Sequence, residues 1–375
     1  MPKRLADDRC GCRAAKLPRR RRRHLYLVLD DWEKGYSIHK LDLSSDPDAA
    51  AAAADDEPPN QPPAGDGAGD ITTEQRLPSA TFRIEAPRGF SGLFTAFGTK
   101  IMATHRTPRR AAPMFDVRTR VDGKLLLLDH FNSAFQMLVP PPPETEPNVE
   151  LLWEWGWLPA PPFRHYVVAH AVHPDGSTVF FSAQKAETGR RRATFSFDVK
   201  QSKWTRRGAW RLPFGGRGYY DGELDAWVGL SGDPDSRGHL CACEVVSSSH
   251  ADDHVDDGQP PAPAPAPPAW KLSKEKLFCV DPAEKHIGAT LVYMGGRGEF
   301  CLVQCLSMDD RDKEDVWEEF LPHRLRFLLR VTTFFLKYDK NGDLRTAHRR
   351  VRSYRLPKAA TLYSDDLETP VAFWM

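Results

Sequence analysis

The sequence predicts an all-β protein, and three observations support this class. The chain of 375 residues contains 32 prolines and 26 glycines, which interrupt it too often for long helices. Between them, short segments rich in Val, Ile, Leu, Phe, Tyr and Thr alternate apolar and polar positions with period two, as strands do. Asp-Gly and Asn-Gly pairs, which favour hairpin turns, separate some of these segments. With 41% hydrophobic residues, the chain can also form a core.

The charge balance argues against a general attraction to nucleic acid or to an anionic membrane. The chain has 52 Lys and Arg residues against 51 Asp and Glu residues, a net charge of +1. It has no run near the roughly 18 consecutive apolar residues that a spanning helix needs. The seven cysteines are an odd number in a chain without a secretory signal, so we expect reduced thiols. These features predict a soluble protein of the cytoplasm or nucleus, with no membrane attachment.

Four stretches are too polar, too rich in proline or too low in complexity to contribute to a packed core. The first is a basic leader at residues 1–23, which we expect to be disordered. The others are expected insertions at residues 46–79, 140–150 and 247–268, because strand-like sequence continues on both sides of each. The chain is therefore predicted to form one β domain over residues 24–375, with long disordered loops inserted into it.

Three hairpins are predicted in order along this domain. The first joins strands at residues 24–30 and 36–43 through a short reversal. The second turns at Asp175-Gly176 between two apolar runs, a strong short-range hairpin signal. The third turns at Asn341-Gly342, with the basic run 346–356 as its return strand. Cys241 and Cys243 lie two positions apart within a strand-like segment. They are expected to lie in the core, because residues two apart in a strand share one face.

The predicted strands also recur with a regular spacing. An aromatic residue followed by Asp closes a strand at three places, and Val-Asp does so at a fourth. These pairs are Phe115-Asp116, Phe197-Asp198, Val280-Asp281 and Tyr338-Asp339. The first two steps are 82 and 83 residues, about twice the roughly 40 to 50 residues of a propeller blade. Gly-Gly-Arg-Gly occurs twice, at residues 215–218 and 295–298. This spacing predicts a β-propeller.

The repeated elements resemble those of the kelch type of β-propeller. Tyr293-Met294-Gly295-Gly296 is similar to the kelch strand that ends in a diglycine. Phe197-Asp198 followed by Trp204 is similar to the later kelch elements, a strand end and the start of the outer strand. More specifically, three segments look like a large family of grass proteins of unknown function that resembles F-box-associated and kelch propellers. They are Leu25–Trp32, Gly222–Leu230 and Phe300–Val303. The resemblance implies a fold and no activity.

The sequence predicts five blades. Their approximate limits are residues 24–87, 91–139, 163–213, 218–278 and 288–358. A strand at residues 369–375 is expected to complete the blade that the N-terminus begins, which would close the ring and remove its sheet edges. A sixth blade assembled from the termini is an open alternative. A pair of β-sandwiches is a second alternative, and it predicts no strand that links the termini.

No metal site or catalytic motif is assigned. His165, His170 and His173 lie close in sequence, but their spacing along an extended strand does not bring three ligands together. The segment Asp339–Asp343 opens like a calcium loop, yet its Gly is fourth and its twelfth residue is Arg350. The chain contains no P-loop, G-x-S-x-G or H-E-x-x-H motif. We therefore name no catalytic residue, no cofactor and no metal ligand.

Two arginine-rich stretches are candidates for binding nucleic acid. The run Arg19–Arg23 fits either a nuclear localisation signal or a disordered basic leader, and both readings stay open. The second stretch, residues 345–358, is expected to be an outer strand whose charge protects an exposed sheet edge. Single-stranded RNA would need stacking aromatics between the cations, and only Tyr354 is present. The sequence therefore argues against a nucleic-acid partner.

The two Gly-Gly-Arg loops are the candidates for a functional face. Their residues are Gly215, Gly216, Arg217, Gly295, Gly296 and Arg297. The alternative explanation is structural, since glycines permit tight turns between strands. We predict a non-catalytic scaffold that binds a protein partner through loops on one face, because propellers carry function at their loops. The alternative is an enzyme that uses the central channel, as some propellers of the kelch type do with a metal.

Overall fold

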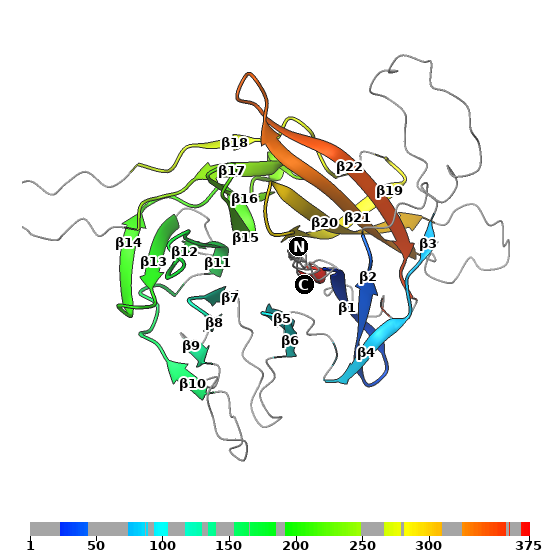
Figure 1. The fold of residues 1–375 in the computed structure, drawn as a ribbon, viewed down its shortest axis with the longest axis horizontal. Coiled ribbons are helices and arrows are strands. Elements are labelled where there is room, and N and C mark those ends of the chain that lie inside the picture. Colours follow the sequence, from blue (N-terminus) through cyan, green and yellow to red (C-terminus); the bar gives the residue numbers. More distant parts are fainter. Residues whose placement is uncertain are drawn as a thin grey trace, which may run out of the picture.

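A computed structural model gives the fold, shown in Figure 1. The ranges that it describes are 23–43, 74–86, 88, 94–103, 117–129, 134–139, 154–164, 166–184, 192–248, 266–278, 281–309, 325–357, 360 and 369–375. The arginine leader before Arg23, most of the three expected insertions, Phe115-Asp116, Val280 and His165 lie outside these ranges. The described regular structure consists almost wholly of β-strands, as the sequence predicts.

The strands form sheets that lie around a central space in a propeller-like arrangement (Figure 1). Sheet 1 is antiparallel and has the order β23 (Val371–Trp374), β1 (Leu25–Trp32), β2 (Gly35–Leu41), β4 (Ala80–Glu85). Sheet 2 pairs β5 (Phe94–Phe97) with β6 (Lys100–Ala103). Sheet 3 has the order β10 (Glu154–Trp157), β9 (Ala134–Val139), β8 (Lys124–Asp129), β7 (Val117–Val121).

The next sheet has eight strands, and we treat its halves as sheets 4 and 5 because each half is an antiparallel four-stranded unit. Sheet 4 has the order β14 (Lys203–Gly208), β13 (Arg192–Asp198), β12 (Thr178–Gln184), β11 (Tyr166–Val172). Sheet 5 continues with β15 (Phe214–Asp221), β16 (Ala226–Ser231), β17 (Leu240–Glu244), β18 (Trp270–Leu272). The parallel pairing of β11 with β15 joins the two halves.

Sheet 6 contains the longest strands of the described fold. Its order is β19 (Glu284–Tyr293), β20 (Glu299–Asp309), β21 (Leu325–Tyr338), β22 (Leu344–Arg355), β3 (Gln75–Arg76). The short β3 runs parallel to the end of β22 and lies within the tract that the sequence predicts to be an insertion. A 3₁₀ helix, η3 (Pro234–Ser236), lies in the loop between β16 and β17. The described residues include no helix long and apolar enough to cross a membrane.

The three predicted hairpins are confirmed. β1 pairs with β2 in antiparallel register, and β11 pairs in the same way with β12 around Asp175-Gly176. β21 pairs with β22 around Asn341-Gly342. One predicted unit is divided, since residues 91–139 contribute β5 and β6 to sheet 2 but β7 to β9 to sheet 3. β6 and β7 do not pair, and the 13 residues between them lie outside the described ranges.

The predicted link between the termini is also confirmed. β23 pairs antiparallel with β1, so that Leu25 lies opposite Trp374 and Val28 opposite Val371. The ladder extends beyond the strands, where the His24 amide donates to the Met375 carbonyl at 2.7 Å. The last strand of the chain therefore completes the first sheet, and this pairing contradicts the sandwich alternative.

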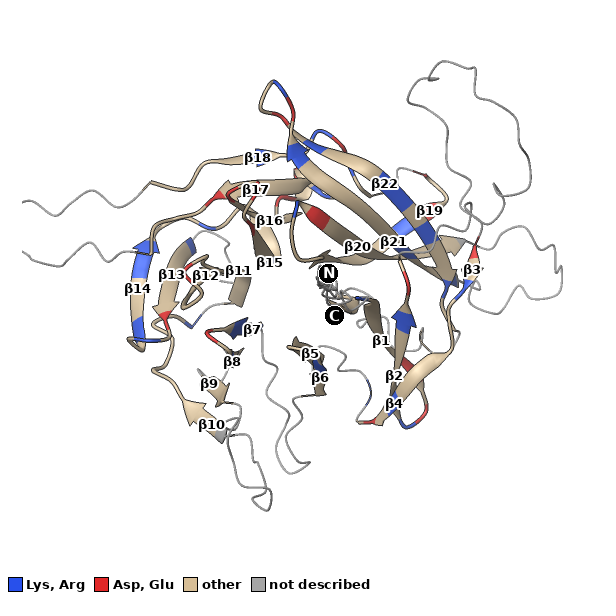
Figure 2. Ribbon diagram, viewed as in Figure 1, with Lys and Arg blue, Asp and Glu red and all other residues tan. Residues whose placement is uncertain are grey.

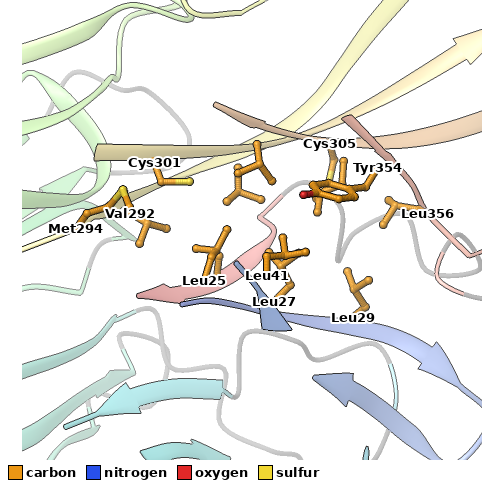
Figure 3. Packing of buried hydrophobic residues seen from close by; sticks show 14 residues of the cluster. Leu25, Leu27, Leu29, Leu41, Val292, Met294, Cys301, Cys305, Tyr354 and Leu356 are labelled. Carbon is orange, nitrogen blue, oxygen red and sulfur yellow. The ribbon is translucent and has the colours of Figure 1, made fainter. Parts of the chain in front are cut away.

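Each pair of neighbouring sheets encloses one cluster of buried apolar side chains. Representative residues are Val28 with Phe94 between sheets 1 and 2, Phe97 with Leu127 between 2 and 3, Phe135 with Phe181 between 3 and 4, Phe180 with Trp227 between 4 and 5, Val228 with Phe300 between 5 and 6, and Leu27 with Val303 between 6 and 1. The packing thus returns to the sheet from which it starts. Figure 3 shows the cluster between sheets 6 and 1.

Strands in the middle of a sheet are buried on both faces, which explains their continuous apolar sequence. The strand β8 belongs to sheet 3, between sheets 2 and 4. Its Leu125 and Leu127 pack toward sheet 2, whereas Leu126 and Leu128 pack toward sheet 4. Successive side chains of a strand point to opposite faces, so four consecutive leucines serve two interfaces. Cys241 and Cys243 are buried on one face of β17, as the sequence predicts.

The repeated aromatic-Asp pairs have a local structural role. Asp198 ends β13, and its carboxylate accepts the Lys200 amide at 2.7 Å and the Gln201 amide at 3.0 Å. Asp339 follows β21 and accepts the amides of Asn341 and Asp343 in the same way. An Asp side chain that bonds to amides two or more residues ahead mimics a backbone turn. The repeat therefore combines an aromatic residue, buried at Phe197 but exposed at Tyr338, with a turn-forming carboxylate.

Candidate functional site

The predicted loop Gly295–Arg297 forms the turn between β19 and β20. Gly295, Gly296, Arg297 and Gly298 all have positive φ, at 94°, 136°, 60° and 67°. A Cβ at Gly298 would lie 2.4 Å from the Leu336 carbonyl oxygen, so the close approach of β21 requires glycine there. This turn agrees with the structural explanation of its glycines and also leaves Arg297 at the surface of a cavity described below.

Gly215, Gly216 and Arg217 lie within strand β15 and not in the loop that the sequence predicts. The register of β15 against β16 shifts between Gly215 and Tyr219, and the irregular part pairs with β11. A Cβ at the following Gly218 would lie 2.3 Å from the ring of Phe214. The glycines therefore let a strand bulge and let its own aromatic side chain fold back over it.

Asp221 connects this strand to the Gly295–Gly298 turn. Its buried carboxylate accepts the amides of Glu223 and Leu224 through Oδ1, at 3.0 and 3.1 Å. Its Oδ2 accepts the Gly298 amide at 3.0 Å, across the interface between sheets 5 and 6. Burial, and then the charge of Asp221 and a hydrogen bond to it, raise the pKa of Tyr293 to about 12. One carboxylate thus holds two turns in a fixed relation.

Asp221 is not among the residues predicted from the sequence, although a signal for it is present. Tyr220-Asp221 is a further aromatic-Asp pair at a strand end, of the kind that recurs along the chain. Glu223, Glu299 and Lys337 were also missed, because no local pattern sets them apart from other surface charges.

A cavity of 660 Å³, which we call the larger cavity, lies beside the Gly295–Gly298 turn. Its charged and aromatic lining consists of Glu223, Arg297, Glu299, Phe334, Phe335, Lys337, His348 and Arg350. Its position follows from strand length, since β21 has 14 residues and β22 has 12, whereas β1 and β2 of sheet 1 have only 8 and 7. The hairpin β21–β22 therefore extends beyond the sheet that covers its inner part.

The larger cavity presents charges of both signs. Arg297, Lys337 and Arg350 contribute positive charge, and Glu223 and Glu299 contribute negative charge. Burial raises the pKa of Glu299, because removal from water disfavours the carboxylate. Beside these charges, the rings of Phe335 and His348 meet edge to face at 5.8 Å. The lining therefore places charged groups of both signs beside apolar surface.

The end of the basic leader lies close to the same turn. Arg23, the first described residue, places its guanidinium against Gly295, where a Cβ would lie 2.6 Å from Nη1. The turn therefore contacts Arg23 at Gly295 and borders the larger cavity at Arg297.

Several arginines of β22, a strand that is blue along part of its length in Figure 2, donate to neighbouring acceptors. Arg345 donates to Asp339 and Glu275, and the Arg352 guanidinium donates to the Asp42 carbonyl at 2.7 Å. β22 has β3 beside one end and the segment Ser273–Glu275 beside the other. The predicted outer strand is therefore partly covered, and Arg345 and Arg352 have structural partners.

The described histidines of the predicted cluster lie in different surroundings. His170 is buried in β11, and burial together with the charge of Arg217 lowers its pKa to about 3. His173 lies at the hairpin turn, 2.9 Å from the Asp175 carboxylate. In the ranges that the structure describes, no three His, Cys, Asp or Glu side chains gather as a metal site. The described cysteines are buried free thiols, and burial raises the pKa of Cys243 and Cys305 to about 12.

Comparison with solved structures gives similarities of low identity. A functionally unknown protein of Desulfotomaculum acetoxidans has 8% identity and a TM-score of 0.28, and the match covers 62% of this chain and 68% of that one. TolB of Acinetobacter baumannii has 11% identity and a TM-score of 0.24, with 64% of each chain covered. A periplasmic gluconolactonase of Pseudomonas aeruginosa has 10% identity and a TM-score of 0.24, with 88% and 82% covered.

No curated protein matches the chain. A family model does match it, over residues 22–125 and 121–354, which together include most of the chain and both turns of the candidate site. The chain belongs to the family described as protein of unknown function, DUF1668.

Proposed function

We propose that this protein is a non-catalytic scaffold, a kelch-like propeller that binds a partner protein at the larger cavity. Three local features support the kelch likeness. β19 is followed by the diglycine of the turn, Phe197-Asp198 ends β13, and Trp204 lies in β14, the outermost strand of sheet 4. We also propose that the protein comes from a grass, because its sequence resembles a family of grass proteins.

The observation that carries the proposal is the charged cavity beside the overhanging hairpin. Its volume of 660 Å³ lies within the roughly 300 to 1,000 Å³ of ligand sites. Its lining has one more cation than anion, so we expect the bound segment to carry acidic residues together with at least one basic residue. Phe335 offers an apolar surface for a side chain between those charges. Charge complementarity of this kind selects partners more than it adds affinity.

Charge reversal at the cavity tests this function. Arg297→Glu combined with Lys337→Glu changes two lining side chains and leaves the strands intact. The matched control is Lys203→Glu combined with Arg206→Glu, two exposed residues of β14 on sheet 4, with the same change in net charge (Figure 2). Circular dichroism and the melting temperature establish that both variants fold.

The readout is quantitative mass spectrometry of cross-linked partners. We expect a protein set that is enriched on the wild type and on the control variant but lost from the cavity variant. Recovery of the same set from all three proteins would contradict binding at the larger cavity.

The enzyme hypothesis has its own measurement. Stoichiometric copper, zinc or iron in the purified protein would favour catalysis in a central channel over a scaffold. We nevertheless place the scaffold first, because the larger cavity has a defined position, volume and charge pattern.

A further inference from the structure

A second cavity, of 340 Å³, lies between sheets 5 and 6 near the first half of β19. The larger cavity borders the other end of that strand, beside Met294, so the two are separate. We call the second one the smaller cavity. The residues on which the argument depends are Ser231, Arg237, Phe278, His286, Ile287 and Thr369. They come from β16, the loop after η3, the segment before β19, β19 itself and the residue pair before β23.

The charge of the smaller cavity has one sign. Arg237 is exposed and contributes a guanidinium, and the described lining contains no Asp or Glu. Ser231 and Thr369 add hydroxyl groups, although the Ser231 hydroxyl also bonds to that of Ser236 at 2.5 Å. Phe278 and Ile287 form apolar walls. The cavity therefore combines donors and one cation with apolar surface.

His286 is held in one orientation inside this cavity. Gln304 on β20 donates its amide to Nδ1 at 3.0 Å, which leaves the proton of the neutral ring on Nε2. The ring also stacks on Phe278, with centroids 4.0 Å apart and planes at 22°. Burial, and then the charge of Arg237, lower the pKa of His286 to about 4. At neutral pH the side chain is thus an uncharged donor, and among the described residues Nε2 has no hydrogen-bond partner.

A bulge and a buried ion pair support this arrangement. The register of β19 against β20 shifts between His286 and Gly288, so Ile287 lies outside the ladder. Such bulges re-aim neighbouring side chains and occur often beside functional sites. On the adjacent strand, Arg330 lies opposite Gln304 and forms a bidentate pair with Glu284 at 2.7 and 2.5 Å. Gln304, which bonds to the histidine, therefore has a paired arginine opposite it in sheet 6.

We propose that the smaller cavity binds a small organic anion, a carboxylate or phosphate group attached to an apolar body. Arg237 supplies the positive charge, the His286 Nε2–H supplies a neutral hydrogen bond, and Phe278 with Ile287 contacts the apolar part. Charge-assisted hydrogen bonds from guanidinium to such oxyanions are among the stronger ones in proteins. A donor-rich lining without carboxylates excludes cations by repulsion from Arg237. This ligand site is independent of the proposed scaffold function, because it lies at the other end of β19.

Calorimetric titration of the full chain tests the proposal with four probes. Benzoate and phenyl phosphate carry each oxyanion on an apolar ring, inorganic phosphate lacks the ring, and tetramethylammonium is the cation control. We expect the wild type to bind at least one ring-bearing anion with a Kd of about 1 mM or lower. Which of the two binds more tightly identifies the oxyanion. Binding of neither, or equal binding of tetramethylammonium, would overturn the proposal.

Two variants locate the binding. Arg237→Gln removes the cation from an exposed position and should weaken anion binding at least about tenfold. His286→Phe preserves the ring that stacks on Phe278 but removes the donor, and should weaken binding about fivefold. Arg206→Gln on β14 is the matched control and should bind as the wild type does. Unchanged affinity in both cavity variants, with melting temperatures near the wild type, would place the anion elsewhere and refute the site.

Discussion

The stability of this protein should depend on pH through His170. This residue lies in β11 opposite Phe181 of β12 and Arg217 of β15, and it is only 8% exposed. Burial is the larger cause that lowers its pKa to about 3, and the charge of Arg217 is the second. The folded protein therefore holds a neutral imidazole that the unfolded chain would protonate near pH 6.5.

The sign of the effect follows from proton binding. Between pH 6.5 and pH 3 the unfolded chain binds a proton at His170 and the folded protein does not, so folding weakens as the pH falls. The stability is complete above pH 6.5 and is lost progressively below it. At pH 5 the loss from this one residue is about 2 kcal/mol. Asp175, whose pKa is held at about 2 by its hydrogen bonds despite burial, loses its contribution only below about pH 4.

The perturbation is His170→Leu, which removes the titration and keeps an apolar side chain of similar volume. Urea unfolding at about pH 7.5 and about pH 5, at constant ionic strength, gives the free energy of unfolding of each protein. The wild type should lose about 2 kcal/mol more than the variant between these two values. All other histidines are common to both proteins, so their effects cancel. Equal losses would refute the reasoning and would mean that His170 has access to water.

Three further outcomes follow from the turns and the buried thiols. Gly298→Ala should destabilise the protein by about 2 kcal/mol more than Gly216→Ala in urea unfolding, because both have positive φ but only the first meets a carbonyl oxygen. Equal losses would contradict the close approach. Asp221→Asn should cost about 3 kcal/mol in the same assay, since a buried carboxylate that accepts three amides becomes a mixed donor and acceptor, whereas the neighbouring Asp225→Asn should change little. Alkylation by iodoacetamide at pH 8, mapped by peptide, should spare Cys305 until the protein unfolds, because burial raises its pKa to about 12; rapid labelling in the folded protein would show that sheet 6 opens.

Local signals in the sequence predict the local features of this fold. The Asp-Gly and Asn-Gly pairs place two hairpin turns, since their backbone preferences act over a few residues. The pairing of β23 with β1 was predictable for a different reason, because a ring of sheets leaves two open edges unless the chain ends meet. Each of these inferences rests on a rule that needs no knowledge of distant contacts.

Contacts between distant segments could not be predicted in the same way. The parallel pairings of β11 with β15 and of β22 with β3 join strands that no hairpin connects. No local pattern in these strands indicates which other strand each one pairs with. The placement of Gly215–Arg217 in a loop was wrong for this reason. Glycines favour both turns and bulges, and only the pairing with β11 decides between them.

Both cavities have one common physical origin in the length of sheet 6. β20, β21 and β22 have 11, 14 and 12 residues, whereas β2 in sheet 1 has 7 and β16 in sheet 5 has 6. Each shorter neighbour covers only part of one face of this long sheet: Phe300 and Leu336 pack against sheet 5, whereas Cys305 and Leu329 pack against sheet 1. The parts that the neighbours leave uncovered can carry polar residues such as the exposed Lys337 at no cost of desolvation. The two proposed binding sites therefore lie at opposite ends of β19, each beside a part of sheet 6 that a shorter neighbour leaves uncovered.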